Sequence, residues 1–108
     1  AVALNHYNDC VDRDTVIRTL QANMPTLRRY GVTRMAVFGS VARDDATDAS
    51  DIDLLVRLDE DYKTFNNYMD LKFAIEGLFP VSRVDLVLEE TLKPAIRDRV
   101  LAEARDVT

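Results

Sequence analysis

Residues 34–58 read RMAVFGSVARDDATDASDIDLLVRL, and they contain two apolar runs separated by a Gly-Ser pair and a polar loop. The first run, residues 34–38, is short and ends at a glycine, which predicts a buried strand. The second run, residues 51–58, alternates between apolar and polar positions. In a strand this alternation places Asp51 and Asp53 on one face and the apolar side chains on the other. The sequence therefore predicts two strands, the second with a pair of aspartates projecting from one face.

Helical patterns surround these strands. The longest, residues 63–79, has a core stripe of Phe65, Tyr68, Leu71, Ile75, Leu78 and Phe79. Met69 and Phe73 widen this stripe, which favours either a surface for a partner or a helix buried on two sides. The other predicted elements are two short helices between Asp12 and Tyr30, a helical turn at 40–43, a strand at 83–88, and a helix that begins at Pro94 with Ile96, Val100, Leu101 and Ala104 on its inner side. We expect residues 12–108 to form one α/β domain, a small mixed sheet flanked by helices, after a weakly ordered lead-in at 1–11.

Composition excludes several classes of function. The 108 residues carry a formal net charge of −5, whereas a protein that grips nucleic acid usually presents a basic face. No apolar run approaches the roughly 18 residues that span a bilayer, and the N-terminus becomes polar too early for a signal peptide. A single cysteine, Cys10, leaves no internal disulfide and fits a reducing compartment. We therefore expect a cytoplasmic protein without a membrane segment or direct nucleic-acid contact.

A third aspartate, Asp85, lies in the predicted strand 83–88 on the face opposite its apolar residues. Adjacent strands are about 4.8 Å apart, so Asp85 on a neighbouring strand would form a three-carboxylate cluster with Asp51 and Asp53. Three such carboxylates repel one another and stay ionised together only with cations between them. Oxygen ligands without a nearby histidine or cysteine favour Mg²⁺, or Mn²⁺, over zinc. These residues predict a metal site that holds two ions.

The Gly39-Ser40 pair predicts a phosphate site. A strand that ends in this pair and continues into a helical turn presents free backbone N–H groups and a hydroxyl to phosphate oxygens. Glycine permits a close approach that a larger residue would block. A phosphate cradle beside a two-metal carboxylate site is suited to phosphoryl or nucleotidyl transfer.

The spacing of Gly39-Ser40 and Asp51-Ile52-Asp53 resembles the signature of the DNA polymerase β-like nucleotidyltransferase superfamily. Residues 37–43 and 50–56, VFGSVAR and SDIDLLV, are similar to its minimal nucleotidyltransferase (MNT) branch, and Val-Asp-Leu-Val at 84–87 resembles that branch's third-aspartate strand. The resemblance implies the polymerase β-like fold, with ATP as donor and Mg²⁺ as cofactor. It also implies an antitoxin that transfers AMP to a tyrosine of a HEPN-domain ribonuclease toxin.

On this resemblance, Asp51 and Asp53 hold the metal ions, and Asp85 completes the site and helps to activate the attacking hydroxyl. Gly39 and Ser40 position the triphosphate. Arg43 either reaches the triphosphate or pairs with a neighbouring aspartate of the polar loop. Because nearly every residue is used in the catalytic core, we expect the acceptor to dock from a partner protein or within a homo-oligomer.

Several alternatives remain open. The acidic residues between 44 and 61 are also typical of a solvated loop. Arg57 and Arg83 fit either surface charges or a donor pocket, and Glu89 and Glu90 are expected to be solvated. The fold could also neutralise a toxin by occlusion, without catalysis, or transfer a nucleotide to a small molecule.

Overall fold

The structure is a computed structural model that describes residues 12–47 and 51–108. The expected lead-in at 1–11 and the end of the polar loop lie outside the described residues. The elements follow the order α1 (Arg13–Ala22), α2 (Met24–Arg28), β1 (Val32–Phe38), α3 (Gly39–Arg43), β2 (Ile52–Leu58), η2 (Glu60–Tyr62), α4 (Phe65–Leu78), β3 (Val84–Leu88), η3 (Glu89–Thr91), α5 (Pro94–Glu103) and β4 (Arg105–Asp106). No helix in these described parts is long and apolar enough to cross a membrane.

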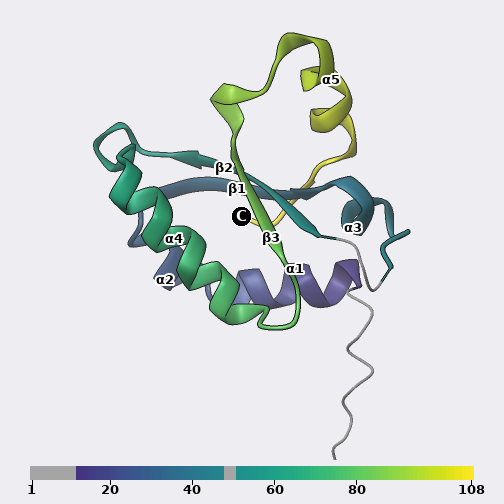
Figure 1. The fold of residues 1–108 in the computed structure, drawn as a ribbon, viewed down its shortest axis with the longest axis horizontal. Helices are drawn as coiled ribbons and strands as arrows, with labels where there is room; N and C mark the ends of the chain where they lie inside the picture. Colours follow the sequence, from purple (N-terminus) through teal and green to yellow (C-terminus); the bar gives the residue numbers. More distant parts are fainter. Residues whose placement is uncertain (1–11, 48–50) are drawn as a thin grey trace, which may run out of the picture.

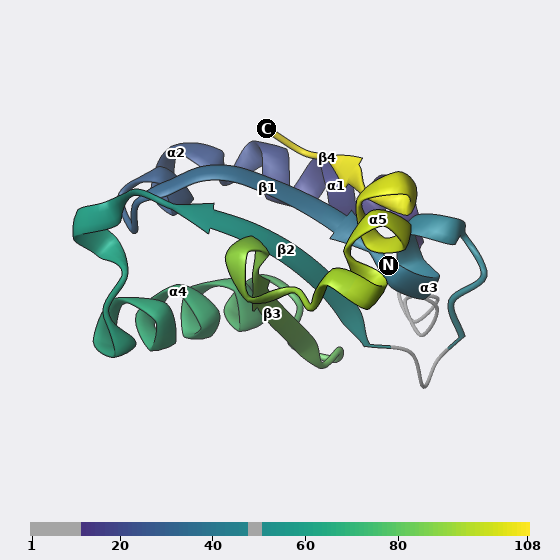
Figure 2. The ribbon, with the colours of Figure 1, turned by 90° about the horizontal axis from the view of Figure 1, so that it is seen from above.

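The four strands form one mixed sheet in the order β3-β2-β1-β4. β1 pairs antiparallel with both β2 and β4, while β2 and β3 run parallel. Figure 2 looks onto the face of this sheet that carries α5. The expected small mixed sheet flanked by helices is confirmed. The two-residue strand β4 was not predicted, because two residues are too few to show any periodicity.

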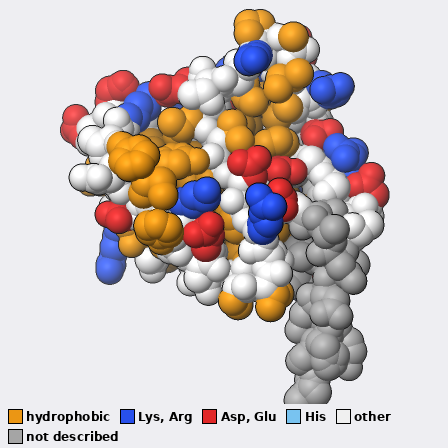
Figure 3. Space-filling model, in the orientation of Figure 1, with side chains coloured by type: hydrophobic (Ala, Val, Ile, Leu, Met, Phe, Trp, Pro, Cys, Tyr) orange, Lys and Arg blue, Asp and Glu red, His pale blue; other side chains and the backbone are white. Residues whose placement is uncertain are grey.

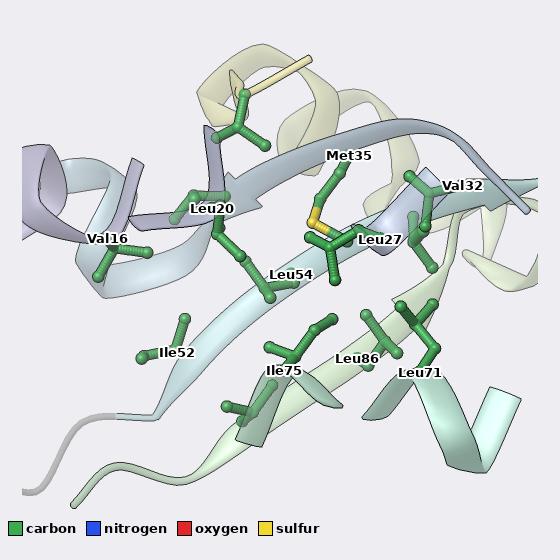
Figure 4. Close-up of a cluster of buried hydrophobic side chains, with 14 of the residues drawn as sticks. Val16, Leu20, Leu27, Val32, Met35, Ile52, Leu54, Leu71, Ile75 and Leu86 are labelled. Carbon is green, nitrogen blue, oxygen red and sulfur yellow. The ribbon is translucent and has the colours of Figure 1, made fainter. Parts of the chain in front are cut away.

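One face of the sheet carries the main hydrophobic core. Figure 1 shows α1, α2 and α4 on this side of the sheet and α5 on the other. The side chains in Figure 4 converge from both layers, and the largest fully buried ones are Val16, Leu20, Leu27, Met35, Val37, Val41, Ile52, Leu54, Val56, Leu71 and Ile75. The apolar positions of β2 at 52, 54, 56 and 58 all point into this core, as the alternation predicted.

The helix and turn signals in the sequence mark real element ends. The Asp12 carboxylate caps α1 by accepting from the backbone N–H of Asp14 and of Thr15. The Thr64 hydroxyl caps α4 in the same way, so this helix begins two residues later than predicted. Gly31 follows α2 with φ of +85°, and a Cβ at this position would lie 2.3 Å from Cβ of Tyr62. Gly31 therefore meets both a backbone and a packing requirement for glycine.

The opposite face has a smaller core, and α5 covers only part of it. Ala36, Leu55 and Val100 are buried here, with Phe38 and Leu101 packed against them. Leu55 shows that β2 is apolar on part of its second face as well. The polar side chains of β2 and β3 on this face lie outside the small core.

Two residues predicted to lie in the core are exposed instead. Phe65, the first residue of α4, is 77% exposed. Ile96, in the first turn of α5, is 37% exposed because the helix contacts the sheet through its later residues. Phe73, left open by the sequence, is 60% exposed, so α4 is not buried on two sides.

We expect Ile75→Ala to lower the free energy of unfolding by about 2–5 kcal/mol, because Ile75 is fully buried between α4 and the sheet. Phe73→Ala on the same helix is the matched control and should change it by less than about 0.5 kcal/mol. Urea unfolding followed by circular dichroism measures both values. Equal losses in the two variants would contradict this assignment of the core.

Candidate active site

Asp53 and Asp85 lie side by side at one end of the sheet. Asp53 on β2 is in register with Asp85 on β3, so the parallel pairing brings the two carboxylates onto the same face. Asp51 immediately precedes β2 and is half-buried. The prediction that a neighbouring strand supplies a third aspartate in register is therefore realised in the geometry. Acidic and basic side chains meet beside β3 in the middle of the molecule (Figure 3).

Gly39 brings the start of α3 against the Asp53 side chain. Phe38 is paired with Asp53 across β1 and β2, and Gly39 follows with φ of +75°. A Cβ at Gly39 would lie 2.2 Å from Oδ2 of Asp53. The Gly-Ser turn and the aspartates, which are separated by a polar loop in the sequence, thus form one site. The glycine is required for both its backbone conformation and its closeness to the carboxylate.

Burial and neighbouring charges make the Asp53 carboxyl difficult to ionise. Its pKa is raised from 3.8 to about 6, first by desolvation and then by the charges of Asp85 and Asp51. Arg43 opposes this shift, and Glu103 adds to it. The site therefore concentrates negative charge that the protein itself does not fully compensate.

The donor set fits a hard divalent cation, because its ligands are carboxylate oxygens whose mutual repulsion such an ion would relieve. Asp51 has a distant cationic partner, with Nε of Arg83 3.9 Å from its Oδ1. Within residues 12–47 and 51–108, no three His, Cys, Asp or Glu side chains are already spaced as metal ligands. Binding of an ion would therefore require the carboxylates to adopt a different arrangement from the one in this structure.

Arg43 extends from the end of α3 and is held by two carboxylates. Its Nε donates to Oδ2 of Asp45 at 3.3 Å, and its Nη1 donates to Oε1 of Glu103 at 3.1 Å. The pairing with an aspartate of the polar loop, one of the two predicted roles, is present. The backbone N–H of Gly39 donates to Oε2 of Glu103 at 2.8 Å. No sequence pattern singles out Glu103, which lies within a helical pattern far along the chain from Gly39.

A second group of charges lies away from this site and changes two expectations. Glu89 is buried rather than solvated, because the chain turns after β3 and folds its carboxylate against the sheet. Oε2 of Glu89 lies 2.7 Å from Nη2 of Arg57 and 3.6 Å from Nη2 of Arg97. Arg57 is therefore engaged in an ion pair, whereas Arg83 is 88% exposed beside Asp51. Glu90 is exposed, as expected, and pairs with Lys63.

Comparison with known proteins identifies the class of protein to which this chain belongs. A family model described as a nucleotidyltransferase domain matches residues 23–107. The chain belongs to this family and is a nucleotidyltransferase. The match includes the Gly-Ser turn and all three aspartates, so the site described above lies within the shared domain.

Individual relatives indicate the branch of the family to which the chain is most similar. The chain is 39% identical over 85 residues to the protein adenylyltransferase MntA of Thermococcus cleftensis, covering 78% of this chain and 84% of that protein. It is 37% identical over 84 residues to MJ0435 of Methanocaldococcus jannaschii, a candidate protein adenylyltransferase, covering 78% and 88%. A solved structure described as a candidate minimal nucleotidyltransferase matches with a TM-score of 0.75 and 42% identity, covering 88% of this chain and 95% of that one. The resemblance to the minimal nucleotidyltransferase branch is confirmed.

A more distant structure shares the fold. A tri-AMPylated Shewanella oneidensis HEPN toxin in complex with MNT antitoxin matches with a TM-score of 0.60 and 18% identity, covering 85% of this chain and 71% of that one. At this identity the match concerns the arrangement of helices and strands, which agrees with the polymerase β-like fold expected from the sequence.

Gly39→Ala should destabilise the protein by about 1–3 kcal/mol, because alanine would be strained at positive φ and would press on the Asp53 carboxylate. Gly77→Ala is the control, since a Cβ there meets nothing within 4 Å and Gly77 lies inside α4. That change should stabilise the protein by about 0.5–1 kcal/mol. Urea unfolding distinguishes the two signs, and a neutral Gly39→Ala would contradict the close approach described here.

Without divalent cations, wild-type stability relative to Asp53→Asn should fall as pH rises from about 4 to 6. The raised folded-state pKa means that the unfolded chain ionises Asp53 first, so the cost of ionising it in the folded state appears over this interval. Below pH 4 the two proteins should have similar stabilities, and above pH 6 the difference should level off. Urea unfolding in EDTA at several pH values measures this difference. A relative gain by the wild type with rising pH would exclude a raised pKa.

Proposed function

We propose that this chain transfers AMP from ATP to the hydroxyl group of a tyrosine in a HEPN-domain toxin and thereby acts as the antitoxin of that protein. The observation that carries the proposal is the single site formed by Gly39, Asp53 and Asp85, with Asp51 at its edge. The relatives named protein adenylyltransferases support the chemistry. The HEPN toxin complex with a similar fold supports the kind of partner.

The proposed reaction is a single displacement at phosphorus. The acceptor oxygen bonds to the α-phosphorus of ATP, the bond from that phosphorus to the oxygen bridging the β-phosphate breaks, and pyrophosphate leaves. Asp85, exposed beside Asp53, is placed to receive the hydroxyl proton. Asp51, Asp53 and Asp85 would hold Mg²⁺ or Mn²⁺, which would supply neutralisation of the triphosphate charge and of the leaving pyrophosphate.

Gly39, Ser40 and Arg43 are assigned to the triphosphate. Gly39 and Ser40 begin α3, where backbone N–H groups lack helical partners. Arg43 lies one turn further along, at the end of the same short helix. A backbone donor and a guanidinium on one turn suit the charge and shape of adjacent phosphate groups.

An apolar surface supports a protein as the acceptor. A groove of about 500 Å³ lies between α4 and β3, and its lining includes Phe65, Tyr68 and Val87. Figure 3 shows the hydrophobic area over α4 beside this groove. The Tyr68 hydroxyl donates to the carbonyl of Leu86, the residue that follows Asp85. A partner seated in the groove would therefore contact β3, the edge strand that carries Asp85.

Asp51→Asn and Asp53→Asn should each reduce AMP transfer by at least about 100-fold, because each removes a carboxylate assigned to the metal ions. The measurement is transfer of label from α-labelled ATP to the co-expressed toxin in Mg²⁺. Asp98→Asn, an exposed aspartate on α5, is the control and should retain wild-type transfer. Label transfer that survives both site substitutions would overturn the proposed function.

The apolar surface also favours a second candidate, neutralisation of the toxin by occlusion, since binding through Phe65 and Phe73 needs no chemistry. The double variant Asp51→Asn/Asp53→Asn separates the two. Toxicity that returns while the complex stays intact supports catalysis, whereas full neutralisation by this variant supports occlusion.

A further inference from the structure

Glu103 occupies donors that the proposed function assigns to the nucleotide. This glutamate is the last residue of α5, and its side chain is 21% exposed. Its Oε2 accepts from the backbone N–H of Gly39 at 2.8 Å, and both of its oxygens accept from Nη1 of Arg43, at 3.1 and 3.3 Å. One carboxylate thus binds the first N–H of α3 and the cation at the end of α3 together.

The surroundings of Glu103 are otherwise unfavourable for an anion. Glu103 contributes to the raised pKa of Asp53, which shows that the two carboxylates interact by repulsion. Among the described residues, only Gly39 and Arg43 form a hydrogen bond or an ion pair with its carboxylate. The two donors therefore hold the Glu103 side chain beside a site that is already acidic.

A triphosphate needs the same donors. Phosphate and carboxylate oxygens accept from backbone N–H and guanidinium groups in the same way, and one N–H cannot serve two anions fully. Resting on the proposed function, we infer that Glu103 is an internal competitor of the nucleotide: its carboxylate holds Gly39 and Arg43, and a bound triphosphate displaces it. The protein thereby lowers its own nucleotide affinity.

The displacement requires only a side-chain movement. Val100 is buried beneath α5, and β4 directly follows the helix and pairs with Ala36 and Val37 of β1. The backbone N–H of Val107 donates to the carbonyl of Met35 at 2.9 Å. Both sides of Glu103 are therefore anchored, so rotation of its side chain releases the donors while α5 stays in place.

Glu103→Gln tests the competition, because glutamine keeps the length of the side chain and an acceptor for Gly39 but removes the charge that binds Arg43. We expect it to bind a non-hydrolysable ATP analogue with Mg²⁺ about tenfold more tightly than the wild type. Inorganic triphosphate in EDTA, a probe that needs no metal, should show a gain in the same direction. Isothermal titration calorimetry measures both, and urea unfolding confirms that the variant is folded.

Two further variants complete the experiment. Glu90→Gln removes one negative charge at the Lys63 pair, away from Gly39, and should leave affinity within about twofold of the wild type. Glu103→Ala removes the acceptor as well as the charge and should also bind more tightly than the wild type, so the result does not depend on glutamine alone.

The outcomes separate this inference from the proposed function. Wild-type binding with equal or weaker binding by both Glu103 variants would mean that Glu103 positions the donors, which overturns the competition but leaves the nucleotide site intact. A gain in Glu90→Gln equal to that in Glu103→Gln would reduce the effect to net charge and also overturn it. Absence of nucleotide binding by every protein would overturn the proposed function itself.

Discussion

The contact between the Asp53 carboxylate and the backbone of Gly39 is the constraint on which the site depends. It exists because β2 lies between β1 and β3: pairing with β1 sets Asp53 opposite Phe38, and pairing with β3 sets it beside Asp85. A one-residue slip of β2 would turn Asp53 into the main core and the apolar side chains out. The register that buries the core on one face therefore also assembles the site on the other.

On the face of the sheet that carries the site, the arginines neutralise only part of the negative charge of the carboxylates. Arg43 is shared between Asp45 and Glu103, and Arg83 is the distant partner of Asp51. Neither is a close ion pair of Asp53, which is why burial and neighbouring carboxylates dominate its pKa. A polyanionic nucleotide enters such a site more readily when cations accompany it and when the arginine contacts rearrange. The Glu103 contact and the acidic cluster are thus electrostatically linked, because Arg43 pairs with Glu103 and both charges act on Asp53.

The strands and the grouping of the Gly-Ser turn with the aspartates could be predicted from the sequence because local patterns specify them. The alternation in residues 51–58 fixed the faces of β2, and one aspartate in a second alternating run gave Asp85. Glu103 and Glu89 could not be predicted in this way. Their partners are distant in the sequence, Gly39 for the first and Arg57 for the second, and no spacing rule links such pairs. The exposure of Phe65, the first residue of α4, likewise depends on tertiary packing that the helical pattern does not specify.

The main hydrophobic core and the candidate site lie on opposite faces of the sheet. The face that carries α1, α2 and α4 buries most of the large apolar side chains and supplies most of the hydrophobic free energy. The α5 face places an acidic carboxyl in a partly desolvated position, which costs stability whenever Asp53 is ionised. The core on the other face offsets this cost, and its buried side chains include none of the three aspartates. Because the cost falls on ionised Asp53, a cation that neutralises the carboxylates would stabilise the fold, and cation binding and folding would be coupled through this one residue.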